Sequence, residues 1–152
     1  MEELLSKECK QYIVVKLDNE QYGIDIRYVD NIVRMQRITR VPKAQNYFKG
    51  VINLRGEIIP VMSLRLRFEL EPDEYNAKTR ILILKADSQY SVGVIVDEVK
   101  EVVTLEVDSI EKAAYDPSDE KSRFLYGIGK YNDSLISLLS ILEVISDKEM
   151  EA

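Results

Sequence analysis

Residues 50–64, GVINLRGEIIPVMSL, place an Arg-Gly pair between two apolar runs. Two apolar runs separated by a two-residue break that contains glycine indicate a β-hairpin. Gly56 can take the positive φ that a tight hairpin turn requires. Arg55 has no comparable role in the turn. The sequence therefore predicts a hairpin, and it leaves open whether Arg55 is a solvated charge or a recognition residue.

The second apolar run, residues 58–62, is apolar on both faces of a strand. Because successive side chains point to opposite faces, we expect one face to meet its own barrel core and the other a neighbouring barrel or a partner. Pro60 lacks the N–H that strand pairing uses, so its strand is expected to be an edge strand or to carry a bulge.

The hairpin recurs later in the chain. Residues 48–64 align with residues 125–141, LYGIGKYNDSLISLLSI, and this alignment places Gly50 beside Gly127 and the Arg55 tip beside Asn132-Asp133. Asn-Asp suits a tight turn on chemical grounds alone, so a hairpin at this position needs no arginine.

A second pair of strand-turn-strand units lies at residues 12–33 and 80–103. Aligning them places Gln21-Tyr22 beside Gln89-Tyr90, at a spacing of 68 residues. Each half of the chain therefore carries two hairpins, as duplication of one small β-unit predicts.

Short β-rich runs dominate the sequence, and the polar segment 68–78 separates the two copies. We therefore expect an all-β fold of two β-barrels with about five strands each. The first barrel is expected over residues 11–67 and the second over residues 77–138. A single β-sandwich is the alternative, and the sequence leaves open whether strands exchange between the barrels.

The sequence predicts a short C-terminal helix over residues 140–148. Ser140 and Glu143 have the spacing of a capping box. The apolar residues Ile141, Leu142, Val144 and Ile145 would form the stripe that packs on a barrel.

Composition excludes several kinds of chemistry. The chain has no histidine and one cysteine, Cys9, so a histidine-based triad, most zinc sites and an intrachain disulfide are impossible. Adjacent acids such as Asp97 and Glu98 point to opposite faces of an extended strand and are expected to be solvated. No phosphate-binding glycine loop occurs. We expect no catalytic residue, metal or cofactor.

The net charge of −6 argues against a nucleic-acid partner. No apolar run approaches the roughly 20 residues of a membrane helix, so direct membrane insertion is not expected. The lone cysteine fits a reducing compartment, and a cytoplasmic location is therefore expected.

The segment KGVINLRGEIIPVMSLRLRF (49–68) is preceded by QYGIDIRYVDNIV and followed by SVGVIVDEVKEVV. In this order and spacing, residues 11–147 resemble the CheW family of chemotaxis coupling proteins. The resemblance implies one CheW-like domain over residues 1–152, built from two SH3-like barrels and without enzymatic activity. It also implies an adaptor that couples transmembrane chemoreceptors to the histidine kinase CheA in bacterial signalling arrays.

The resemblance also implies site residues. The implied receptor-binding residues are Arg55, Gly56, Leu82, Gly93, Val102 and Asn31, and the implied kinase-binding residues are Val29 and Gly50. Asn31 departs from the family pattern, since many relatives have glutamate there. Leu82, Gly93 and Val102 could equally be residues of the barrel core or of the strand backbone, without contact to a partner. An arginine at an interface can form two parallel hydrogen bonds to one partner group, so we expect a partner protein to bind Arg55.

The implied partners are the regulatory domain of CheA and the cytoplasmic tips of methyl-accepting chemoreceptors, which hold the chain at the inner face of the membrane. The regulatory domain resembles this fold, so like-with-like pairing of barrels is implied. The alternative is a regulatory barrel that binds a peptide or small molecule without a kinase partner. An enzyme is a third class, and it would need a pocket with converging carboxylates.

Overall fold

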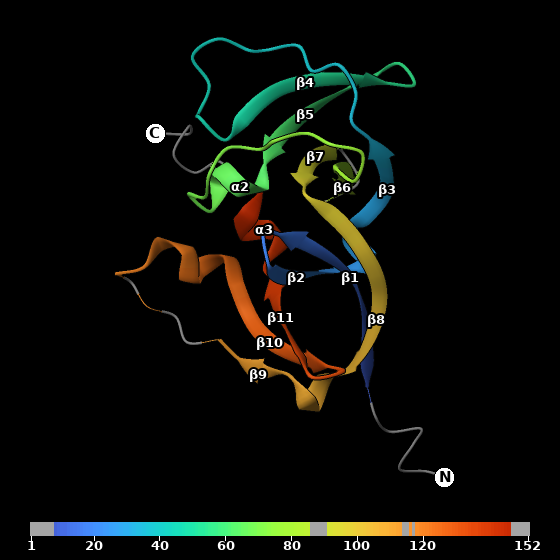
Figure 1. The fold of residues 1–152 in the computed structure, drawn as a ribbon, viewed down its shortest axis with the longest axis vertical. Coiled ribbons are helices and arrows are strands. Elements are labelled where there is room, and N and C mark those ends of the chain that lie inside the picture. Colours follow the sequence, from blue (N-terminus) through green and yellow to red (C-terminus); the bar gives the residue numbers. More distant parts are fainter. Residues whose placement is uncertain (1–7, 86–90, 114–115, 117, 147–152) are drawn as a thin grey trace. The chain divides into compact units, whose positions relative to one another are not determined.

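The computed structural model describes residues 8–85, 91–113, 116 and 118–146 (Figure 1). The chain divides into two compact units. Unit 1 comprises residues 1–15, 19–26 and 100–152, and unit 2 comprises residues 16–18 and 27–99. Each unit is dominated by one β-sheet, and the predicted all-β class is confirmed.

The six-stranded sheet of unit 1 has the strand order β8-β1-β2-β11-β10-β9. Its strands are β1 (Cys9–Leu17), β2 (Glu20–Asp25), β8 (Glu98–Glu106), β9 (Glu111–Lys112), β10 (Leu125–Tyr131) and β11 (Ser134–Leu139). Two short 3₁₀ helices, η2 (Val107–Ser109) and η3 (Glu120–Phe124), and the helix α3 (Ile141–Val144) complete the described part of this unit.

The five-stranded sheet of unit 2 has the strand order β3-β6-β7-β5-β4. Its strands are β3 (Val29–Arg34), β4 (Phe48–Leu54), β5 (Glu57–Ser63), β6 (Arg80–Lys85) and β7 (Ser91–Val96). The 3₁₀ helix η1 (Ile26–Tyr28) precedes β3, and the helix α2 (Leu64–Arg67) follows β5.

This division differs from the expected barrels at 11–67 and 77–138. Strands β1 and β2 of the first copy join β8–β11, whereas β6 and β7 of the second copy join β3–β5. The exchange runs through parallel pairs, β2 with β11 and β7 with β5. Hydrophobic alternation fixes which face of a strand is buried, but it does not say which of two similar hairpins the strand pairs with.

Both predicted tight hairpins are present. Leu54 pairs with Glu57, and the two turn residues between them, Arg55 and Gly56, have φ values of 54° and 84°. In the second copy Asn132 and Asp133 occupy the turn, with φ values of 47° and 64°. Two successive positive φ values characterise the hairpin turn that matches the natural twist of the strands.

The duplication extends to an irregularity in the register. A β-bulge lies between Phe48 and Gly50 in β4, and another lies between Leu125 and Gly127 in β10. Gly50 has a φ of 138°, and a Cβ atom there would lie 2.1 Å from the backbone oxygen of Thr39. Only glycine fits at position 50, because the backbone of Thr39, in the loop before β4, passes too close for a side chain.

The parallel pairs correct the alignment of the repeat. Val61 of β5 lies opposite Gly93, and Leu138 of β11 lies opposite Gly23. Since Val61 and Leu138 are equivalent in the hairpin alignment, Gly23 and Gly93 are equivalent at a spacing of 70 residues. The Gln-Tyr alignment gave 68, and Gln89 and Tyr90 lie outside the described residues.

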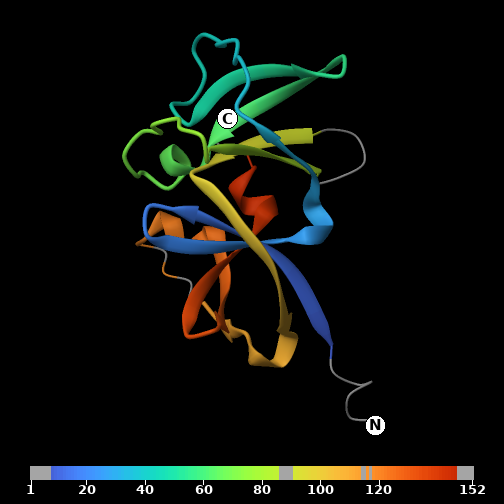
Figure 2. The ribbon, with the colours of Figure 1, turned by 45° about the vertical axis from the view of Figure 1, so that its right-hand side comes forward.

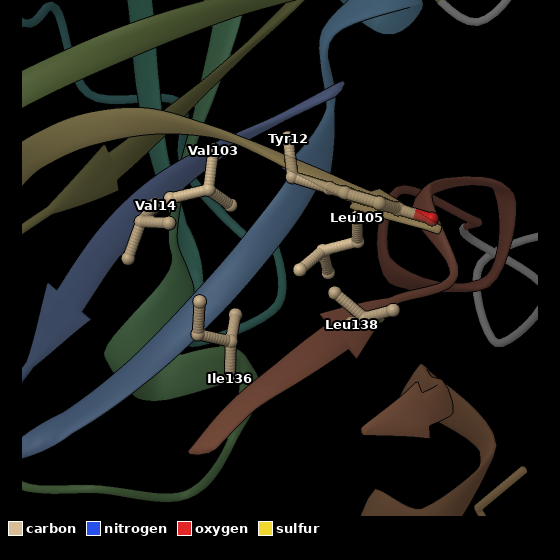
Figure 3. Packing of buried hydrophobic residues seen from close by; sticks show 6 residues of the cluster. All are labelled: Tyr12, Val14, Val103, Leu105, Ile136 and Leu138. Atoms are coloured by element: carbon tan, nitrogen blue, oxygen red, sulfur yellow. The ribbon is translucent and has the colours of Figure 1, made fainter. Parts of the chain in front are cut away.

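Each unit has its own apolar core. The core of unit 1 gathers side chains from β1, β8 and β11, which point toward one another in Figure 3. Its buried residues are Tyr12, Val14, Val103, Leu105, Ile136 and Leu138. The buried core residues of unit 2 are Ile52, Ile59, Val61, Ile81, Ile83 and Ile95. β-Branched side chains dominate the second list, as a pleated, buried surface favours.

The C-terminal helix is shorter than expected. α3 ends at Val144, and residues 147–148 of the expected range lie outside the described residues. The Ser140 side chain makes no capping hydrogen bond. Leu142 is 57% exposed and so does not belong to a buried stripe, whereas Ile141 and Val144 are buried. α3 packs against η3 of its own unit.

The sequence analysis missed α2, which follows β5 as α3 follows β11. The N-cap residue of α2 is Ser63, whose Oγ accepts a hydrogen bond of 3.1 Å from the backbone N–H of Leu66. A single capped turn has no room for an amphipathic repeat, so periodicity gives no signal for it.

Candidate functional site

The tip of the β4–β5 hairpin stands clear of the other strands of its sheet (Figures 1 and 2). Arg55 and Gly56 are exposed, and no atom lies within 4 Å of a Cβ placed on Gly56. The turn is closed locally, because the backbone N–H of Gly56 donates to Oδ1 of Asn53 at 3.0 Å. The tip is therefore an open surface whose turn is closed by a side-chain hydrogen bond.

Arg55 is held in the left-handed region, at a φ of 54°. This conformation costs roughly 1 kcal/mol or more for a residue with a side chain, and asparagine and aspartate tolerate it better than arginine does. The equivalent hairpin uses asparagine at this position. Fold stability therefore does not explain why an arginine occupies the tip.

Beside each tip lies an exposed apolar residue. Ile58 of β5 is 61% exposed, and Leu135 of β11, its equivalent in the second copy, is 65% exposed. Large apolar side chains at matching positions on two hairpins are candidates for protein contacts. The outward apolar face of residues 58–62 was expected to meet a partner, and Ile58 is available for that contact.

Pro60 is accommodated differently from either expectation. β5 lies inside the sheet, and the nearby bulge is in β4, not in β5. The parallel pairing of β5 with β7 begins at Val61, one residue after Pro60. Pro60 therefore precedes the part of β5 that is paired on both sides.

Two of the implied receptor-binding residues lie inside unit 2. Leu82 is 0% exposed in β6, so its side chain packs in the barrel and offers no surface to a partner. Gly93 is buried in β7, and a Cβ atom there would lie 2.9 Å from Cγ2 of Ile81 and 3.2 Å from Cγ2 of Val61. Packing accounts for both residues.

Of the remaining implied residues, Val29, Asn31 and Val102 are at least partly accessible, and Gly50 is buried. Val102, on β8 of unit 1, is 48% exposed. Val29 and Asn31 are half-buried on β3 of unit 2, on either side of a register shift. Asn31 uses Oδ1 to accept a hydrogen bond of 2.8 Å from the backbone N–H of Ile32. Gly50 is buried at the far end of β4 from the tip.

Sequence reasoning missed a charged cluster around Arg65 in unit 2. Nε and Nη2 of Arg65 donate to the two carboxylate oxygens of Asp97 at 2.8 Å each, and Nη2 also contacts Asp18. Nη1 donates to the backbone oxygen of Glu71 at 3.0 Å. Asp97 was expected to be solvated, and the structure instead places it in an ion pair.

This ion pair changes the acidity of its members. Burial raises the pKa of Asp97, but the hydrogen bonds from Arg65 and from the backbone N–H of Asp18 lower that pKa further, and the net shift is downward. The hydrogen bond to Asp97 raises the pKa of Arg65. Both groups stay charged at neutral pH, which suits a structural ion pair. A general acid or base instead needs a pKa near the working pH.

Asp73 lies in the same unit and has the opposite shift. Burial raises the pKa of Asp73, although the hydrogen bond from the Ser63 hydroxyl acts against the rise. Oδ2 of Asp73 is buried without a hydrogen-bond partner. Asp73 therefore opposes folding when it is ionised.

The described residues contain no group of three or more His, Cys, Asp or Glu side chains arranged to hold a metal ion. None of the helices in this described part of the chain has the length and the apolar character of a membrane span.

Comparison with known proteins identifies the family. The family model of the CheW-like domain matches residues 11–149. The chain belongs to the CheW family. The chemotaxis protein CheW of Helicobacter pylori is 35% identical over 92% of this chain and 84% of its own length. The chemotaxis protein CheW of Bacillus subtilis is 35% identical over 94% of this chain and 90% of its own length.

A solved CheW structure has the same fold. The crystal structure of the scaffolding protein TtCheW from Thermoanaerobacter tengcongensis superimposes with a TM-score of 0.81 and 32% sequence identity. The match covers 91% of this chain and 89% of TtCheW. The CheW family membership and the fold class inferred from the sequence are both confirmed.

Proposed function

We propose that this chain is a non-enzymatic chemotaxis scaffold that couples transmembrane chemoreceptors to the histidine kinase CheA. The similar proteins are named as chemotaxis proteins, and TtCheW is described as a scaffolding protein. The observation that carries the proposal is the tip of the β4–β5 hairpin. An exposed arginine stands there in an unfavourable backbone conformation, three residues before the exposed Ile58.

The tip suits recognition of a partner that carries carboxylates. A guanidinium group donates two hydrogen bonds in a fixed geometry to one carboxylate. We assign Arg55 and Gly56 to receptor binding, together with Asn31 and Val102, whose side chains are at least partly accessible. Leu82 and Gly93 support that role indirectly, by holding the strands of unit 2 in place.

Contacts with the CheA regulatory domain are assigned to the exposed hairpins. A regulatory domain of the same fold would offer matching barrels, and Ile58 and Leu135 are apolar residues exposed at equivalent places. Burial of such a side chain at an interface contributes roughly 1.5–3 kcal/mol. We also assign Val29 and Gly50 to CheA binding. Gly50 is buried, so its contribution is to shape the backbone of β4.

Such a scaffold works in the cytoplasm, where receptor tips hold it near the inner face of the membrane. Its partners are the CheA regulatory domain and the receptor tips, and neither role needs a cofactor, a metal or nucleic acid.

The test is a pair of titrations, one with the CheA regulatory domain of the same organism and one with a receptor cytoplasmic fragment. Arg55→Ala is expected to weaken receptor binding by about 2 kcal/mol, roughly a thirtyfold loss. Lys112→Ala, which removes an exposed cation from β9 of unit 1, is the matched control and should bind as the unaltered protein does. Unaltered protein that binds neither partner, while a small metabolite co-purifies with it, would refute the coupling role.

A further inference from the structure

The net charge of the whole chain hides a strongly basic segment. Residues 31–56 contain six lysines and arginines and no aspartate or glutamate. Unit 2 carries 13 basic residues against 10 acidic ones, whereas unit 1 carries 8 against 17. The two units therefore differ in the sign of their net charge, and the positive charge gathers in one stretch of unit 2.

Two adjacent cavities open along this stretch. The first, of about 550 Å³, is lined by residues 40–46, 48 and 49, which include Arg40, Lys43 and Lys49. The second, of about 410 Å³, shares Arg40 and Lys49 with the first and adds Arg37. Its apolar lining comes from Met35, Ile38 and Tyr75. We call the two cavities together the basic surface.

The cations of the basic surface have no acidic partner. In the part of the chain that the structure describes, no carboxylate lies within ion-pair distance of Arg37, Arg40, Lys43 or Lys49. The other charged cluster of the same unit, around Arg65, is fully paired. Four unpaired cations around a concave surface raise the local concentration of anions.

The concave shape is built into the backbone. Thr39 and Val51 exchange two backbone hydrogen bonds of 2.8 Å and close the base of the loop between β3 and β4. Gly50 permits this close approach. Tyr47 is buried inside the loop, its backbone oxygen accepts from the N–H of Ser63 at 2.7 Å, and its ring lies 4.4 Å from the guanidinium carbon of Arg67.

We propose that the basic surface binds an acidic peptide segment of a partner protein, with carboxylates on Arg37, Arg40, Lys43 and Lys49 and one apolar side chain in the cavity beside Met35 and Tyr75. The site is separate from the Arg55 tip, and the inference does not depend on the coupling role. Carboxylates suit this surface because arginine binds them bidentately, and the apolar lining gives a peptide an anchor.

Two features favour a peptide over other polyanions. A flat bilayer contacts a flat or convex face, whereas these cations line hollows. Single-stranded nucleic acid is held by a series of aromatic side chains along a groove, whereas each cavity of the basic surface is lined by a single aromatic residue, Phe48 in the first and Tyr75 in the second.

The test uses the blocked peptide acetyl-Glu-Asp-Leu-Asp-Glu-amide and the full-length, isotope-labelled protein. Nuclear magnetic resonance titration is expected to shift the backbone amides of residues 35–49. Replacing the four acids of the peptide by their amides should abolish these shifts. Replacing its leucine by glycine should weaken binding several-fold, because the apolar anchor is lost.

Charge reversal tests the residues. The double variant Arg40→Glu with Lys49→Glu should weaken peptide binding at least tenfold. The second double variant, Arg37→Glu with Lys43→Glu, changes two exposed residues and should have a similar effect if the first pair disturbs the fold. The control double variant Lys112→Glu with Lys130→Glu reverses exposed charges in unit 1 and should bind as the unaltered protein does.

Several results would overturn the inference. Equal shifts with the acidic and the amide peptides would show that charge is not recognised. Preferential binding of phosphatidylserine vesicles or of oligothymidylate would assign the surface to a membrane or to nucleic acid. Self-association that disappears in the Arg40→Glu with Lys49→Glu variant would make a second copy of the chain the occupant.

Discussion

Arg65 donates two hydrogen bonds to Asp97, from Nε to Oδ1 and from Nη2 to Oδ2, each 2.8 Å long. The same guanidinium group also binds Asp18 and the backbone oxygen of Glu71. One side chain therefore ties together the turn after β1, the loop after α2 and the residue between β7 and β8. These segments are far apart in the sequence, and Arg65 fixes their arrangement within unit 2.

Arg65→Ala is expected to lower the free energy of unfolding by about 2–3 kcal/mol, because hydrogen bonds to charged groups are strong and Asp97 would be left without its partner. Arg65→Lys should recover only part of the loss, since lysine lacks the planar fork. Urea unfolding at neutral pH measures both. A loss below about 0.5 kcal/mol would show that water replaces the ion pair at little cost.

Asp73→Asn is expected to stabilise the protein at pH 7. The pKa of Asp73 is raised above its ordinary value of 3.8 in the folded state, so folding favours the protonated form. The destabilisation is present when Asp73 is ionised, and it disappears as the pH falls through the folded pKa. The stability difference between variant and unaltered protein should therefore shrink toward pH 3.8. Unfolding curves between pH 7 and 4 test this, and a difference that grows on acidification would contradict it.

Arg55→Asn is expected to raise stability by about 0.5–1 kcal/mol, because asparagine tolerates the left-handed conformation better. The reciprocal change, Asn132→Arg in the second hairpin, should lower stability by a similar amount. Thermal melts compare the two. If Arg55→Asn were destabilising, the arginine would have a role in the fold, and the argument for recognition at the tip would fail.

The glycines of the first hairpin should respond unequally to alanine. Gly50→Ala places a Cβ atom 2.1 Å from a backbone oxygen, and we expect a loss of at least about 3 kcal/mol, as strained and overpacked sites show. Gly56→Ala meets no atom within 4 Å, so only its positive φ should cost roughly 1 kcal/mol. Equal losses in denaturant unfolding would mean that Thr39 moves aside.

The helix α3 offers a neighbouring pair. Ile141 is buried and Leu142 is 57% exposed. Ile141→Ala should therefore cost about 2–5 kcal/mol, whereas Leu142→Ala should change stability by less than about 0.5 kcal/mol. A shift of the melting temperature in the Leu142 variant as large as that in the Ile141 variant would place Leu142 in a contact that the described residues do not show.

Local features of this fold were predictable from the sequence. The Arg-Gly and Asn-Asp pairs give turns with two positive φ values, and the alignment of Gly50 with Gly127 marks two equivalent bulges. These features depend on residues close in sequence, where turn chemistry and alternation act directly.

Features that depend on distant residues were not predictable in the same way. Nothing in β1 and β2 indicates that they pair with β11 and not with β5, because the two hairpins are alike. Asp97 could not be distinguished from a solvated acid without Arg65 beside it.

The candidate site was predicted in part. Sequence placed Arg55 correctly at an exposed tip, but it could not separate Val102, which is exposed, from Leu82, which is buried. No run of lysine and arginine clear of acidic neighbours was expected, and residues 31–56 contradict this. The stretch was missed because its cations are spaced three or six residues apart and form no contiguous run. The folded loop brings four of them together, and binding depends on the charge within about one Debye length, roughly 8–10 Å.

The division of the sequence between the two units bears on how the chain is made. Apart from three residues, unit 2 is one continuous stretch, 27–99, inserted between the two parts of unit 1. During translation all strands of unit 2 can emerge and pair before β8, β10 and β11 have been synthesised. Until then β1 and β2 lack the other strands of their sheet. The last strand of unit 1 therefore leaves the ribosome only after every strand of the inserted unit has been synthesised.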